Sequence, residues 1–134
     1  MVSDGNATIF VSNMDRSIRF YTEVLGMKLT NRFGNDWATV TVGPGLTIGL
    51  HPASEKYPAP GTKGAMALGL EIDTTIDKAV ARLAELGVRL SGSITRSDPG
   101  NFASIEDPDG NAIYLWEKTP VGVSERELAV AEAR

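Results

Sequence analysis

The chain repeats part of its sequence at a spacing of 61 residues, and this repeat constrains the fold more than any other feature. The segment Leu25–Leu29 aligns without a gap with Leu86–Leu90, and the same spacing places Val11 on Ile72. Such self-similarity indicates a duplicated unit in which each copy shields the apolar face of the other. Because 134 residues is the length of one domain, we expect a single domain built from two copies.

In the first copy the hydrophobic pattern changes from a strand to a helix and then back to strands. Residues 7–12 alternate in polarity, as a strand does, and residues 12–26 space their apolar side chains as one face of a helix. Ser12 or Asn13 is the expected N-cap, and Gly26 the expected end. The helix face is predicted to hold Met14, Ile18, Tyr21 and Leu25, and three further strands are predicted at 27–33, 36–42 and 46–52.

The second copy shows the same order of elements. A strand at 67–73 is followed by a helix at 74–87, whose apolar face is predicted to hold Ile76, Val80, Leu83 and Leu86. Thr74 and Asp77 have the spacing of a capping box, and Gly87 ends the helix. Three strands are predicted at 88–96, 101–107 and 111–117, the last two joined by the turn sequence DPDG.

These elements predict an α+β fold of two βαβββ modules. The modules span 6–52 and 64–118 of a single domain, 1–118, and the segment 53–63, rich in proline and glycine, is a solvated connector. The tail, 119–134, has a capping-box spacing and many helix formers. It is expected to be a short helix, either fraying or docked on a partner subunit.

Charge and composition exclude several classes of partner and site. The net charge is −4 and the basic residues are scattered singly, so no nucleic-acid partner is expected. The chain has no cysteine, which excludes disulfides and thiolate metal sites. It shows no signal peptide and no apolar run of membrane-spanning length, so no membrane association is expected and the predicted location is cytoplasmic.

Two segments resemble a known family. VSNMDRSIRFYTEVLGMKL follows the first strand and FASIEDPDGNAIYLWE closes the chain's second module, and together with the paired modules they resemble the vicinal oxygen chelate superfamily of glyoxalases, extradiol dioxygenases and bleomycin-resistance proteins. The resemblance covers residues 6–118. It implies that each module curls into half a barrel, that the helices lie outside, that the cup holds a small-molecule ligand, and that the protein is a homodimer.

The metal-dependent members of that family carry histidine or glutamate at four positions inside the cup. The resemblance places Asn6, Gly49, Ala67 and Tyr114 at these positions, and two of the four have no side-chain donor atom at all. The chain also contains a single histidine, His51, so neither a three-histidine site nor a two-histidine site with a carboxylate can be built within one chain. We therefore expect no metal and no cofactor, and glyoxalase I or extradiol dioxygenase activity is disfavoured.

The alternation of side chains along each strand predicts two different faces. The helix-facing core should contain Leu46, Ile48, Leu50, Leu68, Leu70, Ile72, Ile113 and Leu115. The other face combines aromatic and polar side chains with small residues that leave space, a mixture typical of a small-molecule pocket. Its candidate ligand-binding residues are Asn6, Thr8, Phe10, Trp37, Thr39, Phe102, Tyr114 and Trp116. The alternative is that these side chains simply fill a closed barrel.

Two residues of that inner face form a candidate catalytic pair. His51 and Glu71 share the inward parity, and a histidine beside a carboxylate is the usual material of a general base. The alternative for His51, which precedes a proline at a strand end, is a solvated position at the rim. Glu106, Asp107 and Asp109 are expected to bond their own turn backbone rather than a cation.

Three functions remain open at this point. The first is a metal-independent protein that sequesters an aromatic or antibiotic-like ligand, as bleomycin-resistance proteins do. The alternative is an enzyme of the same superfamily, a lyase, isomerase or dioxygenase, which uses His51 and Glu71 or an atypical metal site. The third is a domain whose function lies in association with other chains.

Overall fold

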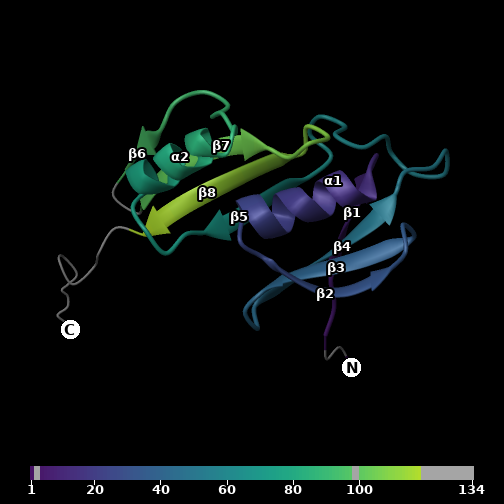
Figure 1. Ribbon diagram of the computed structural model, residues 1–134. Helices are drawn as coiled ribbons and strands as arrows, with labels where there is room; N and C mark the ends of the chain where they lie inside the picture. Colours follow the sequence, from purple (N-terminus) through teal and green to yellow (C-terminus); the bar gives the residue numbers. More distant parts are fainter. Residues whose placement is uncertain (2–3, 98–99, 119–134) are drawn as a thin grey trace. The chain divides into compact units, whose positions relative to one another are not determined.

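The computed structural model describes residues 1, 4–97 and 100–118, and Figure 1 shows two successive sets of strands with one helical segment each. The first set is β1 (Ala7–Val11), α1 (Met14–Arg19) with the π-helical turn η1 (Phe20–Val24), β2 (Lys28–Phe33), β3 (Trp37–Val42) and β4 (Leu46–Pro52). The second is β5 (Ala67–Glu71), α2 (Ile76–Glu85), β6 (Thr95–Arg96), β7 (Gly100–Glu106) and β8 (Ala112–Lys118). The predicted α+β fold of two βαβββ modules is confirmed. The tail, 119–134, lies outside the described residues.

Both modules arrange their strands in the same order. The first sheet runs β1-β4-β3-β2 and the second β5-β8-β7-β6. Strand β1 is parallel to β4, with Thr8 opposite Gly49 and Phe10 opposite His51, and β3 is antiparallel to β2 and β4. Since opposite residues of neighbouring strands share a face, the start and the end of the first module contribute side chains to the same surface.

The chain packs as two compact units, and the turn between β7 and β8 belongs to the first. One unit is Met1–Ala67 with Glu106–Ile113, and the other is Leu68–Ile105 with the described residues from Tyr114 onward. The turn sequence DPDG therefore packs with the first module, although in the sequence it belongs to the second.

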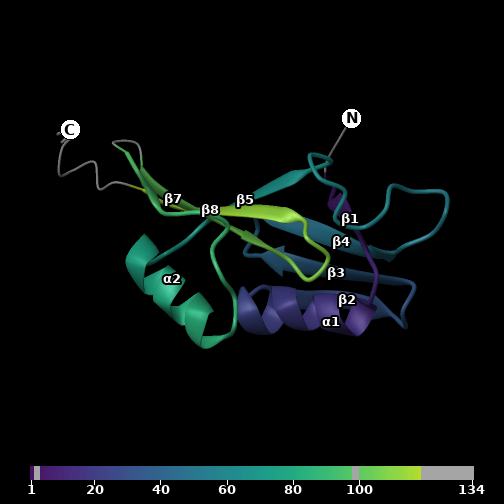
Figure 2. The same cartoon turned by 90° about the horizontal axis from the view of Figure 1, so that it is seen from above.

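The first helical segment begins and ends as its sequence predicts. Asn13 is the N-cap, and its Oδ1 accepts a hydrogen bond from the backbone N–H of Arg16 at 2.9 Å, which satisfies one of the free donors of the first turn. The segment contacts β4 of its own sheet, along which it lies in Figures 1 and 2. Met14, Ile18 and Tyr21 are buried as predicted.

The predicted cap of α2 is wrong by one residue. Thr75, not Thr74, is the N-cap, and its Oγ1 accepts from the backbone N–H of Lys78 at 3.2 Å. Asp77 does not complete a capping box because its carboxylate is held by Arg96 at 2.7 Å. A carboxylate from β8 takes part instead, since Glu117 accepts from the backbone N–H of Ile76 at 2.7 Å. In the described part of the chain no helix is long and apolar enough to cross a membrane.

The predicted helix-facing core is buried except near strand ends and at a sheet edge. The buried members are Ile48, Leu50, Leu68, Ile113 and Leu115. Leu46, Leu70 and Ile72 are only half-buried, because Leu46 begins β4, Leu70 lies on the edge strand β5, and Ile72 follows that strand.

The strand predicted over 88–96 is reduced to the two residues of β6. The reason lies in Gly92, whose φ of 98° is outside the extended range and bends the chain there. One backbone hydrogen bond, from Ser91 N–H to the Ser104 carbonyl at 2.7 Å, still ties the preceding segment to β7.

Candidate functional site

Four aromatic rings of the first unit gather on one face of its sheet, and we call Phe10, Trp37, His51 and Tyr57 the aromatic cluster. Phe10 of β1 and Tyr57 of the connector are stacked, with ring centroids 4.4 Å apart and an angle of 16°. His51 of β4 meets both rings edge-on, at 5.6 Å from Phe10 and 5.2 Å from Tyr57. Trp37 of β3 lies 6.3 Å from His51, also edge-on. Three aromatic rings therefore surround the imidazole.

The imidazole of His51 has a defined tautomer. Its Nδ1 lies 2.8 Å from the carbonyl oxygen of Pro52, and since a carbonyl oxygen only accepts, Nδ1 carries the proton. In the neutral ring Nε2 is then a hydrogen-bond acceptor. Among the residues that the structure describes, no hydrogen-bond partner of Nε2 is found. The cluster thus offers one polar acceptor within an aromatic surface.

The space expected above the glycines of the inner face is occupied by aromatic rings. A β-carbon on Gly49 would lie 2.8 Å from Cζ2 of the Trp37 indole. In the second unit, a β-carbon on Gly69 would lie 2.8 Å from Cε2 of Tyr114. Glycine therefore permits close ring-on-backbone packing at both sites. The prediction that Gly49 leaves free space is wrong, because the indole fills that space.

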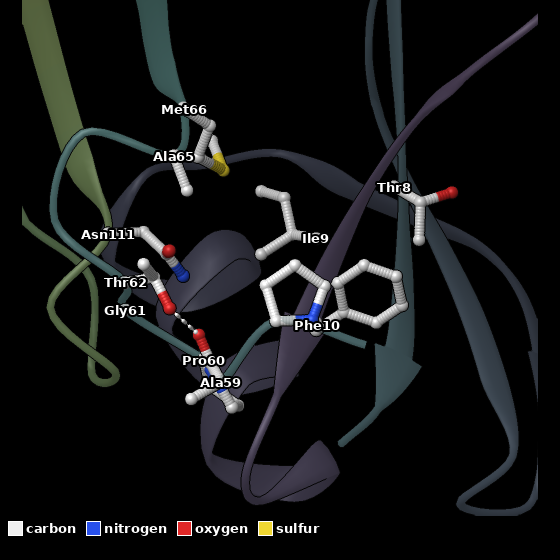
Figure 3. A pocket seen from close by; sticks show the side chains of 11 residues that line it. Thr8, Ile9, Phe10, Ala59, Pro60, Gly61, Thr62, Ala65, Met66 and Asn111 are labelled. Atoms are coloured by element: carbon white, nitrogen blue, oxygen red, sulfur yellow. Dashed lines mark hydrogen bonds between the residues drawn. The ribbon is translucent and has the colours of Figure 1, made fainter. Parts of the chain in front are cut away.

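A pocket of about 130 Å³ opens beside Phe10 at the free edge of β1 (Figure 3). We call it the edge pocket. Its walls are Thr8–Phe10 of β1, Pro58–Thr62 of the connector, and the side chains of Ala65, Met66 and Asn111. Most of this lining is apolar. The pocket and the aromatic cluster share Phe10, and we treat the two together as the candidate site of the first unit.

A buried hydrogen-bond network holds the turn that contributes Asn111. Both oxygens of Asp107 are occupied: Oδ1 accepts from the backbone N–H of Asp109 and of Asn111, and Oδ2 accepts from the Asn111 side chain at 2.9 Å and from the Tyr21 hydroxyl at 2.8 Å. Burial, and secondly the negative charge of Asp107, raise the pKa of Tyr21 above its ordinary value. The expectation that this acidic turn bonds its own backbone holds for Asp107.

The same turn anchors the connector. Asp109 accepts hydrogen bonds from the backbone N–H and the hydroxyl of Ser12. Its carbonyl meets the connector at Gly61, where a β-carbon would lie 2.8 Å from the carbonyl carbon of Asp109 and still closer to its oxygen. Gly61 has a φ of 77°, so both its conformation and this contact require glycine. The backbone of the pocket wall at Gly61 therefore packs directly against the backbone of this turn.

The predicted ligand-binding residues fall in both units. Asn6 and Thr8 are exposed, with the Thr8 hydroxyl 3.3 Å from Asn6 Oδ1, and Thr39 is bonded to the hydroxyl of Thr30. In the second unit the rings of Tyr114 and Trp116 lie 6.0 Å apart. The other predicted members are the half-buried Phe10, Trp37 and Phe102. The candidate catalytic residues are divided, with His51 in the first unit and Glu71 in the second, and their pairing stays a prediction.

Sequence reasoning missed the contribution of the connector and of Asn111. Tyr57 and Pro58–Thr62 lie in the segment interpreted as solvated, and no periodicity identifies them. The one available signal was an aromatic residue followed by prolines in the sequence YPAPG, because prolines stiffen a segment enough to hold a ring in place.

The donor set does not fit the metal of the metal-dependent vicinal oxygen chelate proteins. Gly49 and Ala67 have no donor atom, and a larger residue at Gly49 would collide with Trp37. Within residues 1, 4–97 and 100–118, no group of three or more His, Asp or Glu side chains lies close enough together to hold a metal ion.

Comparison with known proteins finds a matching family, a similar enzyme and similar solved structures. The family described as the Glyoxalase/Bleomycin resistance protein/Dioxygenase superfamily matches residues 5–115. A probable chloroplastic lactoylglutathione lyase of Arabidopsis thaliana is 31% identical over 127 residues, covering 82% of this chain and 34% of that protein. The chain therefore spans about a third of the length of this relative.

Among solved structures, TnmS3, an antibiotic binding protein from Streptomyces sp. CB03234, is 28% identical with a TM-score of 0.69, over 89% of this chain and 99% of that one. A superfamily member from Sphaerobacter thermophilus is 27% identical with a TM-score of 0.70, over 88% and 98% of the two chains.

Proposed function

The chain belongs to the Glyoxalase/Bleomycin resistance protein/Dioxygenase superfamily, and on that premise we propose that it is a metal-independent protein that binds an aromatic or antibiotic-like small molecule. The observation that carries the proposal is the aromatic cluster with its adjoining edge pocket. Aromatic rings bury a large area against a flat ligand and add stacking energy to it. The antibiotic bound by TnmS3, a relative over nearly the whole chain, supports a ligand of this class.

Tyr57 provides the sharpest test of the site. It is 40% exposed and lies in the connector, so its removal leaves the apolar core intact. We expect Tyr57→Ala to raise the dissociation constant of an aromatic ligand about three- to ten-fold, because a stacked ring contributes about 0.5–1.5 kcal/mol. The neighbouring Lys56→Ala is the matched control, since it also removes an exposed side chain of the connector.

The ligand itself can be found by a thermal-shift screen of aromatic metabolites and antibiotics, since a ligand at about 100 times its dissociation constant adds about 2.7 kcal/mol of stability. Quenching of Trp37 fluorescence, measured in a Trp116→Phe background, then gives the dissociation constant. A hit whose affinity is equal in wild type, Tyr57→Ala and Lys56→Ala would contradict the proposed site.

A second candidate function is catalysis, which the lactoylglutathione lyase relative favours. The Nε2 of His51, an acceptor with no hydrogen-bond partner among the described residues, can take a proton. Glu71, the other predicted catalytic residue, lies in the second unit, and its part in catalysis stays a prediction. We expect any turnover of lactoylglutathione, the compound in that relative's name, to be abolished by His51→Ala without loss of folding. Unchanged turnover would exclude His51 as the base, and stoichiometric metal in protein purified without chelators would refute the metal-independent mechanism.

We also propose that the protein acts as a cytoplasmic homodimer. The edge strand β2 supports association, because its Leu29 and Phe33 are 39% and 60% exposed, and exposed apolar edges favour pairing with another chain. Light scattering at micromolar concentration tests this, and a monomer mass would contradict it.

A further inference from the structure

We propose that the edge pocket takes a single six-membered ring bearing an O–H or N–H group, and that Oδ1 of Asn111 accepts the hydrogen bond from that group. The inference rests on the proposed function and gives the chemical class of its ligand. It is drawn from the size of the pocket and from the way each polar side chain in its wall is already bonded.

The size of the pocket sets the size of the group. Its volume is about 130 Å³, and an apolar cavity of about 150 Å³ holds one benzene molecule. Drug-sized ligands occupy pockets of about 300–1,000 Å³. The edge pocket therefore accommodates one ring or a short branched chain, while the rest of a larger ligand lies outside it, against the aromatic cluster that shares Phe10.

The orientation of the Asn111 amide is fixed by Asp107. A carboxylate only accepts hydrogen bonds, so Asn111 must turn its Nδ2 toward Asp107 Oδ2, at 2.9 Å. The backbone N–H of Asn111 bonds the other oxygen at 2.8 Å. The amide oxygen, Oδ1, is left over, and within the described part of the chain no donor bonds it. Asn111 is 6% exposed and its amide points toward the other lining side chains in Figure 3.

Of the two threonines of the pocket, Thr62 also presents an acceptor. Its hydroxyl donates to the Ala59 carbonyl, and a hydroxyl that has given its proton to a protein acceptor offers only lone pairs to a ligand. The hydroxyl of Thr8 points away from the other lining side chains in Figure 3. The side chains around the pocket therefore present two acceptor oxygens, those of Asn111 and Thr62, against one remaining N–H, that of Asn111. A ligand group that donates is favoured over a carboxylate.

Asn111 is the acceptor that recognises the ligand because it is both buried and held in place. Its partner Asp107 is itself fixed by the Tyr21 hydroxyl at 2.8 Å, whereas Thr8 and Thr62 are exposed. A fixed acceptor loses little conformational entropy when a ligand binds, and a ligand that covers this oxygen without donating a hydrogen bond to it is disfavoured.

Phenol and toluene are the matched probes, since they differ in the hydroxyl but not in the ring. The dissociation constants of both are measured by NMR titration of wild type and of Asn111→Ser, whose hydroxyl can still donate to Asp107. We expect the phenol-to-toluene affinity ratio to fall about three- to ten-fold in the variant, the value of one hydrogen bond. Comparing ratios cancels the different hydration of the two probes. Lys56→Ala, which removes an exposed side chain of the connector outside the pocket lining, is the control and should leave the ratio unchanged.

A crystal structure of the wild-type phenol complex gives an answer that needs no variant. A phenol oxygen about 2.7–2.8 Å from Asn111 Oδ1 supports the proposal, and a hydroxyl turned toward solvent overturns it. An unchanged ratio in Asn111→Ser, or an equal fall in Lys56→Ala, also overturns the role of Asn111 while leaving the proposed function intact. If neither probe binds the wild type, the edge pocket is not part of the ligand site.

Discussion

Gly61 of the connector and Gly64, just after it, allow the contact between the connector and Asp109 to be measured. Gly61 and Gly64 both have positive φ, 77° and 80°. A β-carbon at Gly61 would overlap the carbonyl of Asp109, whereas nothing lies within 4 Å of a β-carbon at Gly64. Gly61→Ala and Gly64→Ala therefore impose the same backbone strain, and only the first breaks the contact between the connector and the turn.

The expected magnitudes follow from this difference. A side chain at positive φ costs about 1–2 kcal/mol, and replacing glycine by alanine regains about 0.4–1 kcal/mol through the unfolded chain. Gly64→Ala should thus lower the free energy of unfolding by about 1 kcal/mol. At Gly61 the methyl would lie 2.8 Å from the carbonyl carbon, well inside the ordinary 3.5–4.0 Å contact. Overpacking of this kind adds about 1–3 kcal/mol.

Urea unfolding followed by fluorescence measures both variants. We expect Gly61→Ala to be the less stable by at least about 1 kcal/mol, and to weaken phenol binding in the edge pocket, while Gly64→Ala binds phenol as the wild type does. Equal losses of stability in the two variants, with phenol binding unaffected in both, would refute the view that the connector packs tightly against Asp109.

Other predictions concern the buried polar groups of the first unit. Ser17 Oγ is buried without a hydrogen-bond partner in the described part of the chain, so Ser17→Ala should raise the free energy of unfolding by about 1 kcal/mol; a loss in urea unfolding would show that the hydroxyl is satisfied. Tyr21→Phe should lower it by about 1–3 kcal/mol, because Asp107 loses a buried donor. Since the pKa of folded Tyr21 is raised, the stability linked to its proton is present below about pH 10 and is lost as the pH rises further. The stability difference between wild type and Tyr21→Phe should therefore shrink above pH 10, and a difference that grows there would contradict the raised pKa.

Much of the fold could be predicted because local patterns determine it. The repeat that aligns Gly26 with Gly87 marks the ends of two helical segments, and both glycines have positive φ. The alternation along β4 separates the buried Ile48 and Leu50 from the half-buried His51, as a two-residue period requires. The cap at Asn13 was predictable for the same reason, since it depends on its immediate neighbours.

The site was harder to predict because it depends on contacts distant in sequence. Tyr57 stacks on Phe10, and Gly61 meets Asp109, through a connector that has no period to identify its partners. The indole of Trp37 covers Gly49 because of its side-chain rotamer, which the parity of a strand does not specify. Asn111 owes its orientation to Asp107 and Tyr21, contributed by a turn and a helical segment far apart in the chain.

The central claim is that a small molecule binds in the first unit, against the aromatic cluster and the edge pocket. Its most direct test is an NMR titration of isotope-labelled protein with the strongest hit of the thermal-shift screen. The account predicts saturable shifts of the backbone amides of Phe10, His51, Tyr57 and Asn111, larger than those at Lys78 on the surface of α2. Saturable binding with no shift at these four residues would contradict it.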